Sequence, residues 1–115
     1  MRAVRDEVLT LINRYGRRYE LLSTLGDYCD TLVEALAIYE EAFTLAEESN
    51  DLEEAFDIAQ SALSAIEVEG IAPPDAHDWI FRAQRTAEFS HDSFSVKSCL
   101  RLIDTVKQLP CVNGF

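Results

Sequence analysis

Residues 39–66 constrain the fold of this chain most strongly, because they scan as two amphipathic helices joined by the short polar segment Ser49-Asn50-Asp51. Apolar residues recur at steps of three and four on both sides of this segment, which is the spacing of one helix face. Ser, Asn and Asp side chains compete with helix and favour caps, so the helix is expected to break there. The sequence therefore predicts a helical hairpin at the centre of the core.

Residues that break helices are scarce elsewhere. The 115 residues include four glycines and three prolines, and the prolines all come late, at Pro73, Pro74 and Pro110. The length suits one domain with one core, and a hydrophobic fraction of 48% argues against disorder. We predict an all-α, single-domain bundle of about five mostly antiparallel helices over residues 1–109, followed by a short tail over residues 110–115.

The first half of the chain predicts two helices before the turn at Asn50. The first spans residues 2–22 and passes through Gly16, where it could divide into two. At Leu25-Gly26-Asp27 we expect a break, with Gly26 in the left-handed position past a helix end and Asp27 capping the next helix, over residues 28–48. After the turn, Asp51 is expected to cap a helix that ends at Gly70.

Two further helices are expected after the proline pair, with a break at Ser90-His91-Asp92. The tail, including Phe115, is expected to be coil. Shifting the chain against itself aligns Ala42 with Ala83 and Asp51 with Asp92, which leaves open two similar helical hairpins. The expected buried residues of these two helices are Trp79, Ile80, Ala83 and Ala87 in the first, and Val96, Cys99, Leu100, Ile103 and Val106 in the second.

Charge is distributed unevenly along the chain, whose formal net charge is −11. Residues 1–18 carry five arginines and two acidic residues, whereas residues 19–76 carry fifteen Asp or Glu and no Lys or Arg. Such an acidic segment repels nucleic acid and anionic membrane and attracts a basic partner. We therefore expect a protein partner with a basic surface, no direct binding of nucleic acid and no membrane association.

The carboxylates of the central hairpin form the candidate site. On the helix expected over residues 28–48, Glu34, Glu41 and Glu48 recur every two turns, about 10.5 Å apart, opposite the apolar face. One interpretation is a solvated helix face, and the other is a docking surface. The candidate partner-binding residues are Asp27, Asp30, Glu34, Glu40, Glu41, Glu47, Glu48, Glu53, Glu54 and Asp57. A docking surface of this kind predicts an adaptor, chaperone-like or inhibitory protein without enzymatic activity.

The same hairpin resembles a tetratricopeptide repeat. The run Asn50-Asp51-Leu52-Glu53-Glu54-Ala55, followed by Ala62-Leu63, is similar to that family's turn and second helix, with Ala55 and Ala62 at its small-residue positions. The resemblance covers residues 39–66. It implies a peptide- or protein-binding helical scaffold rather than catalysis.

Two alternative functions share these carboxylates. An acidic surface could mimic nucleic acid and inhibit a nucleic-acid-binding enzyme, as phage-encoded anti-defence proteins and immunity proteins do. The run DLEEAFDIAQ also resembles a metal motif of all-helical nucleotide pyrophosphohydrolases, which implies Mg²⁺ held by Glu54 and Asp57 together with Asp27 and Asp30. Against this alternative, Asp27 and Asp30 are expected on the solvent side of their helix, and the acidic segment offers no cation for a phosphate chain.

The cysteines and histidines do not suggest a metal site. Cys29, Cys99 and Cys111 form no closely spaced pair, and His77 and His91 are dispersed, so we expect no zinc and no cofactor. Cys29 and Cys99 are expected to be small core residues. Charged residues rather than an apolar segment follow Met1, so we expect a cytoplasmic location. Whether the chain forms a homo-oligomer is left open.

Overall fold

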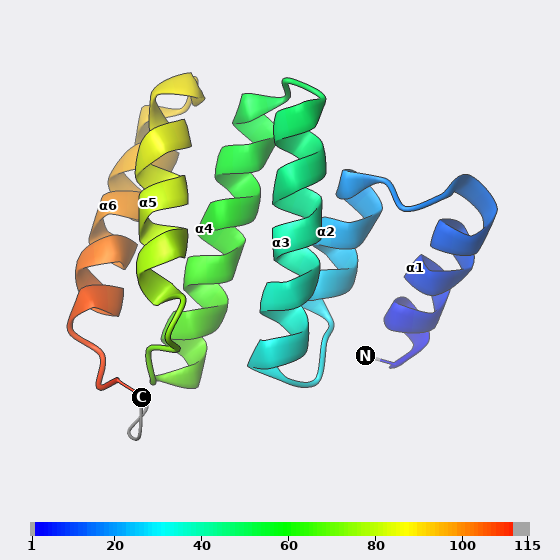
Figure 1. Ribbon diagram of the computed structural model, residues 1–115, viewed down its shortest axis with the longest axis horizontal. Coiled ribbons are helices and arrows are strands. Elements are labelled where there is room, and N and C mark those ends of the chain that lie inside the picture. Colours follow the sequence, from blue (N-terminus) through cyan, green and yellow to red (C-terminus); the bar gives the residue numbers. More distant parts are fainter. Residues whose placement is uncertain (1, 112–115) are drawn as a thin grey trace.

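Six α-helices and one short 3-10 helix form the fold in the computed structural model, which describes residues 2–111, with side chains from residue 4 onward (Figure 1). The described residues contain no strand, so the all-α prediction is confirmed. Phe115 and most of the predicted tail lie outside the described residues. In chain order the helices are α1 (Arg2–Tyr15), α2 (Tyr19–Asp27), α3 (Leu32–Glu48), α4 (Leu52–Glu69), α5 (Ala76–Thr86), the 3-10 helix η1 (Ala87–Phe89) and α6 (Ser93–Lys107).

Helices α3 and α4 form the predicted hairpin. The pair α3 and α4 and the pair α2 and α3 are the most extensively packed in the molecule. At the turn, Asn50 adopts a left-handed conformation with φ of 58°. The Asp51 side chain then accepts a hydrogen bond of 3.3 Å from the backbone N–H of Glu54, as predicted for a cap. Small side chains let the two helix axes approach closely. The fully buried alanines of the pair are Ala42, Ala46, Ala55, Ala59 and Ala62.

Helix α4 is the centre of the molecule, because it packs against α3 on one side and against α5 and α6 on the other. In Figure 1, α2 lies behind α3, α6 lies behind α5, and α1 stands apart at one end. The molecule is a slab of 40 × 34 × 22 Å, so its thin direction holds about two layers of helix. Since α5 and α6 pack against α4 far more than against each other, they do not form a second hairpin like the first.

In the N-terminal region, one alternative left open by the sequence is settled and one expectation is corrected. The helix expected over residues 2–22 divides at Gly16, which has φ of +89° and begins the turn between α1 and α2. The break expected at residues 25–27 comes slightly later: α2 ends at Asp27, and Gly26 lies in its last turn, without a left-handed conformation and with the ring of Tyr39 packed against it. Thr31, not Asp27, caps the next helix: its side chain accepts a hydrogen bond of 3.2 Å from the N–H of Glu34. Helix α3 therefore starts at residue 32 instead of 28.

The C-terminal half encloses the largest buried side chain. Trp79 of α5 is 1% exposed and meets the ring of Phe43 edge-on, with centroids 6.1 Å apart. Asp92 caps α6 as predicted, accepting a hydrogen bond of 3.0 Å from the N–H of Phe94. On α6 the expected burial of Leu100 is wrong: Leu100 is 52% exposed, and Leu102 takes its place in the core.

Candidate functional site

The outer carboxylates of α3 meet arginines from the N-terminal end of the chain. Arg17 binds Glu41 with two hydrogen bonds of 2.7 Å, a paired geometry that matches a guanidinium to a carboxylate. Arg5 of α1 lies 3.2 Å from Asp30 and 3.9 Å from Glu34. The hydrogen bond from Arg17 keeps the pKa of the Glu41 carboxyl below its usual range. The basic block at the start of the chain therefore neutralises this side of α3.

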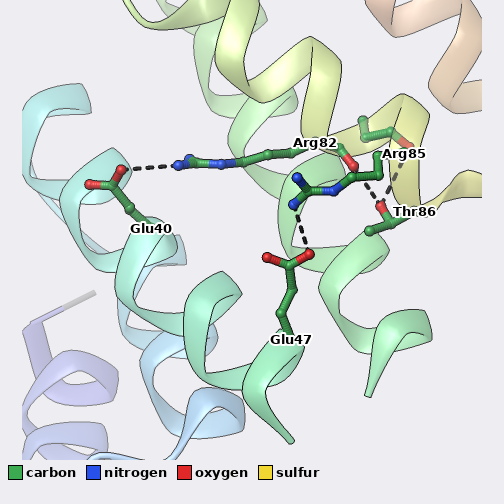
Figure 2. A network of polar contacts seen from close by, with 6 residues as sticks. Glu40, Glu47, Arg82, Arg85 and Thr86 are labelled. Carbon is green, nitrogen blue, oxygen red and sulfur yellow. Dashed lines mark hydrogen bonds and ion pairs between the residues drawn. The ribbon is translucent and has the colours of Figure 1, made fainter. Parts of the chain in front are cut away.

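The opposite side of α3 is neutralised by α5 (Figure 2). Arg82 lies 3.1 Å from Glu40, and Arg85 lies 2.7 Å from Glu47. The guanidinium of Arg82 also stacks over Trp79, 4.5 Å from the centroid of its rings. Figure 2 shows both arginines reaching from α5 across to the carboxylates of α3. These arginines therefore join the two helices as well as cancelling charge.

The row of carboxylates predicted along one helix is therefore not a continuous surface of free negative charge. Asp27 and Asp30 precede α3 and are not part of it, and the acidic residues that do lie on it are mostly paired. Near the hairpin turn, the imidazole of His91 lies 3.6 Å from Glu53. Among the described residues, the acidic candidates without an ion pair are Glu48, Glu54 and Asp57, together with Asp27, which accepts a hydrogen bond from a tyrosine.

A groove of about 690 Å³ forms a second acidic surface, bounded by the end of α2, the start of α3 and one face of α4. Four carboxylates line it, and no Lys or Arg does. Three of the four were candidates from the sequence, and Glu69 was not. The lining comprises Gly26, Asp27, Cys29, Asp30, Thr31, Leu32, Ala35 and Tyr39 on one side, and Asp57, Gln60, Ser61, Ser64, Ala65, Val68 and Glu69 on α4.

The groove exists because the residues along its floor are small. In an antiparallel hairpin, residues at equal distance from the turn lie opposite each other, which pairs Ala35 with Ala65 and Tyr39 with Ser61. The short side chains of Ala35, Ser61, Ser64 and Ala65 leave the surface between the helices open. Among the larger side chains that line the groove, Tyr39 is held against the wall by a hydrogen bond of 2.5 Å from its hydroxyl to Asp27.

Asp27 and Asp30 lie on the solvent side, as expected. Both are exposed, with the Asp30 side chain 76% accessible, and both also line the groove that Asp57 of α4 lines. The four carboxylates proposed for Mg²⁺ do not converge, however. Among residues 2–111, no group of three or more His, Cys, Asp or Glu is arranged to hold a metal ion. The pyrophosphohydrolase alternative therefore gains no support from the geometry.

Of the four carboxylates that line the groove, Asp30 is paired with Arg5, and the other three have no ion pair among the described residues. Partial burial, followed by the nearby charges of Glu53, Asp51 and Asp92, raises the pKa of the Asp57 carboxyl. Burial and the charge of Asp57 also raise the pKa of Glu54, one turn away. A cation bound beside Asp57 would relieve this repulsion. The groove is therefore an electrostatic match for a positively charged ligand.

Sequence reasoning missed several residues of this groove. Ser61, Ser64 and Ala65 follow the steps of three and four that place residues on one helix face, and this pattern was the available signal. Cys29, expected in the core, is half-buried at the groove, and burial raises the pKa of its thiol. Cys99 is buried as expected, and Cys111 is exposed.

Comparison of the chain with protein-family models, with curated proteins and with solved structures finds no match in any of the three. None of the helices in the described part of the chain combines the length and the apolar character needed to span a membrane.

Proposed function

We propose that this chain is a non-enzymatic protein-interaction module that binds a basic partner protein through the groove beside α4. The observation that carries the proposal is the contrast in charge between two surfaces. Four of the five carboxylates of α3 have arginine partners, whereas Asp27, Asp57 and Glu69 in the groove have no ion pair among the described residues. A basic side chain entering the groove would meet carboxylates without a competing cation and would partly exclude water from them, which strengthens the attraction.

One contact within the chain resembles the proposed contact with the ligand. Arg5 reaches from α1 to Asp30, which lines the groove, and its guanidinium lies 3.2 Å from that carboxylate. The edge of the groove therefore already accommodates one arginine side chain. The proposed partner-binding set therefore keeps three of the ten candidate carboxylates, Asp27, Asp30 and Asp57, and adds Glu69.

The resemblance of residues 39–66 to a tetratricopeptide hairpin stays a prediction, and it favours the same class of function, a scaffold that binds peptides or proteins. The nucleic-acid-mimic alternative is less well supported. Mimicry needs a regular array of free negative charges, but Glu34 and Glu41 each lie beside an arginine.

A titration with poly-L-arginine, followed through backbone amide signals in nuclear magnetic resonance spectra, tests the proposal. We expect the largest shifts at Gly26, Ser61, Ser64 and Ala65, and small shifts on the outer face of α3. The double variant Asp57→Asn/Glu69→Gln should weaken binding at least tenfold, because it removes two of the three groove carboxylates that have no ion pair.

The matched control is Glu41→Gln/Glu48→Gln, which removes the same amount of charge from α3. It should change the affinity less than twofold. Equal losses in the two double variants would show that net charge alone attracts the polycation, and the proposal would be wrong. Shifts confined to α3 would contradict it as well.

A further inference from the structure

The geometry points to an extended peptide segment, with basic side chains about five residues apart, as the ligand of the groove; this inference rests on the proposed function above. Asp57 and Glu69, two of the groove carboxylates without an ion pair, lie on the same helix, twelve positions apart. At a rise of 1.5 Å per residue, that is about 18 Å along α4. An extended chain advances about 3.3 Å per residue, so the first and sixth residues of a peptide span about 17 Å.

The chemistry between the two ends suits a peptide backbone. The floor of the groove presents the hydroxyls of Ser61 and Ser64 and the amide of Gln60, which donate and accept hydrogen bonds. Backbone N–H and C=O groups of an extended segment need partners of both kinds once they leave water. The small side chains at Ser61, Ser64 and Ala65 also let a backbone come close to α4, which larger residues would prevent.

The apolar residues of the groove fit the same ligand. Leu32 and Val68 lie at the end of the groove near Glu69, and Val68 is 86% exposed. They can contact the aliphatic part of an arginine or lysine side chain while its charged end reaches the carboxylate. A recognised segment therefore has basic residues at both ends and small or polar residues between them.

Two capped hexapeptides of identical composition test this inference by magnetic resonance titration. One places its two arginines at the ends, as Arg-Gly-Ser-Ala-Gly-Arg, and the other places them together, as Arg-Arg-Gly-Ser-Ala-Gly. We expect the spaced peptide to bind at least fivefold more tightly, because only it reaches both carboxylates. Asp57→Asn should abolish this difference, whereas Glu41→Gln, which removes one charge from α3, should leave it intact.

The outcomes separate the two proposals. If poly-L-arginine binds in the groove but the two hexapeptides bind equally well, the proposed function stands and the extended, spaced ligand is wrong. If spermine, a linear polycation without amide groups, binds as tightly as the spaced peptide, charge alone is recognised and the peptide ligand is wrong. If poly-L-arginine does not bind in the groove, the proposed function itself fails.

Discussion

The outer faces of α3 and the groove beside α4 come from the same acidic stretch of sequence, yet they differ in their electrostatic state. On α3, four glutamates lie beside arginines from α1, the linker before α2, and α5. In the groove, Asp57 and Glu69 have no ion pair among the described residues, and Asp57 lies near other acidic groups. The comparison shows that a count of charges along a sequence does not locate the charge that remains available on the surface.

The difference follows from which helices are neighbours. Residues 19–81 contain no Lys or Arg, so any cation that pairs with this segment must come from outside it. Helix α3 is flanked by such outside elements on both sides. The groove is bounded by α2, the start of α3 and α4, which belong to the segment without cations, and an outside cation, Arg5, reaches it only at Asp30 among the described residues.

The largest effect on stability is expected from substitution of Gly26, which tests the packing of the groove wall. A Cβ atom at this position would lie 2.5 Å from the ring of Tyr39, so Gly26→Ala must displace that ring and its hydrogen bond to Asp27. We expect a loss of about 1–3 kcal/mol in the free energy of unfolding, measured by chemical denaturation and circular dichroism.

Gly16→Ala is the control on the α3 side, since Gly16 lies next to the Arg17 that binds Glu41. Its φ is +89°, but nothing lies within 4 Å of an added Cβ, so only backbone strain of about 1 kcal/mol is expected. A larger loss at Gly16 than at Gly26 would mean that the groove wall is less tightly packed than its contacts indicate.

Removal of an arginine from either side of α3 should have a smaller effect on stability, and the size of this effect should differ between the two sides. Arg82→Ala removes an ion pair with Glu40 and also the stacking of the guanidinium over Trp79 and Phe43. We expect a cost of about 1–2 kcal/mol in the same denaturation experiment. Arg17→Ala removes only an exposed pair and should cost less than about 1 kcal/mol. Equal costs would show that stacking contributes nothing beyond charge.

The smallest expected effect tests the comparison most directly. Glu41 and Asp57 should make contributions of opposite sign to the pH dependence of the free energy of unfolding. The pKa of Glu41 is lowered, so its ionised form stabilises the fold above the ordinary carboxyl range, and this stability is lost as the pH falls through the lowered pKa. The pKa of Asp57 is raised, so its ionised form opposes folding at neutral pH, and protonation removes that opposition as the pH falls.

At pH 7, Glu41→Gln should therefore destabilise the protein and Asp57→Asn should stabilise it, each by roughly 0.5 kcal/mol. Both differences from the parent chain should vanish in acid, once the parent carboxyls are protonated. Denaturation curves at several pH values would show this. Changes of the same sign in both variants at pH 7 would contradict the contrast between the two surfaces.

Local chemistry explains which parts of the fold were predictable from the sequence. Asp51 and Asp92 cap helices through hydrogen bonds to amides two or three residues away, so a short window of sequence contains the whole interaction. Gly70 likewise ends α4, as predicted, and it adopts a left-handed conformation there. The buried alanines of the hairpin follow the helical period.

The errors arose where a distant residue decides the local structure. Glycine is common just past the end of a helix, but Gly26 lies within α2. The ring of Tyr39 occupies the space beside it, which a larger residue would fill. Leu100 and Leu102 of α6 are both apolar, and only the packing of α6 against α4 decides which of them is buried. The ion pairs on α3 join residues 24 to 42 positions apart, far beyond any local pattern.

The setting of Trp79 also determines how the protein can be observed. It is the only tryptophan, and it lies between α3 and α5 under the guanidinium of Arg82. Its fluorescence emission therefore reports on the packing of α5 in the core. Separation of α5 from its neighbours would shift the emission towards that of a solvated indole. Trp79 is not part of the groove lining, so occupation of the groove should change the emission much less. Ligand entry and core opening are thus spectroscopically distinguishable in the unmodified chain.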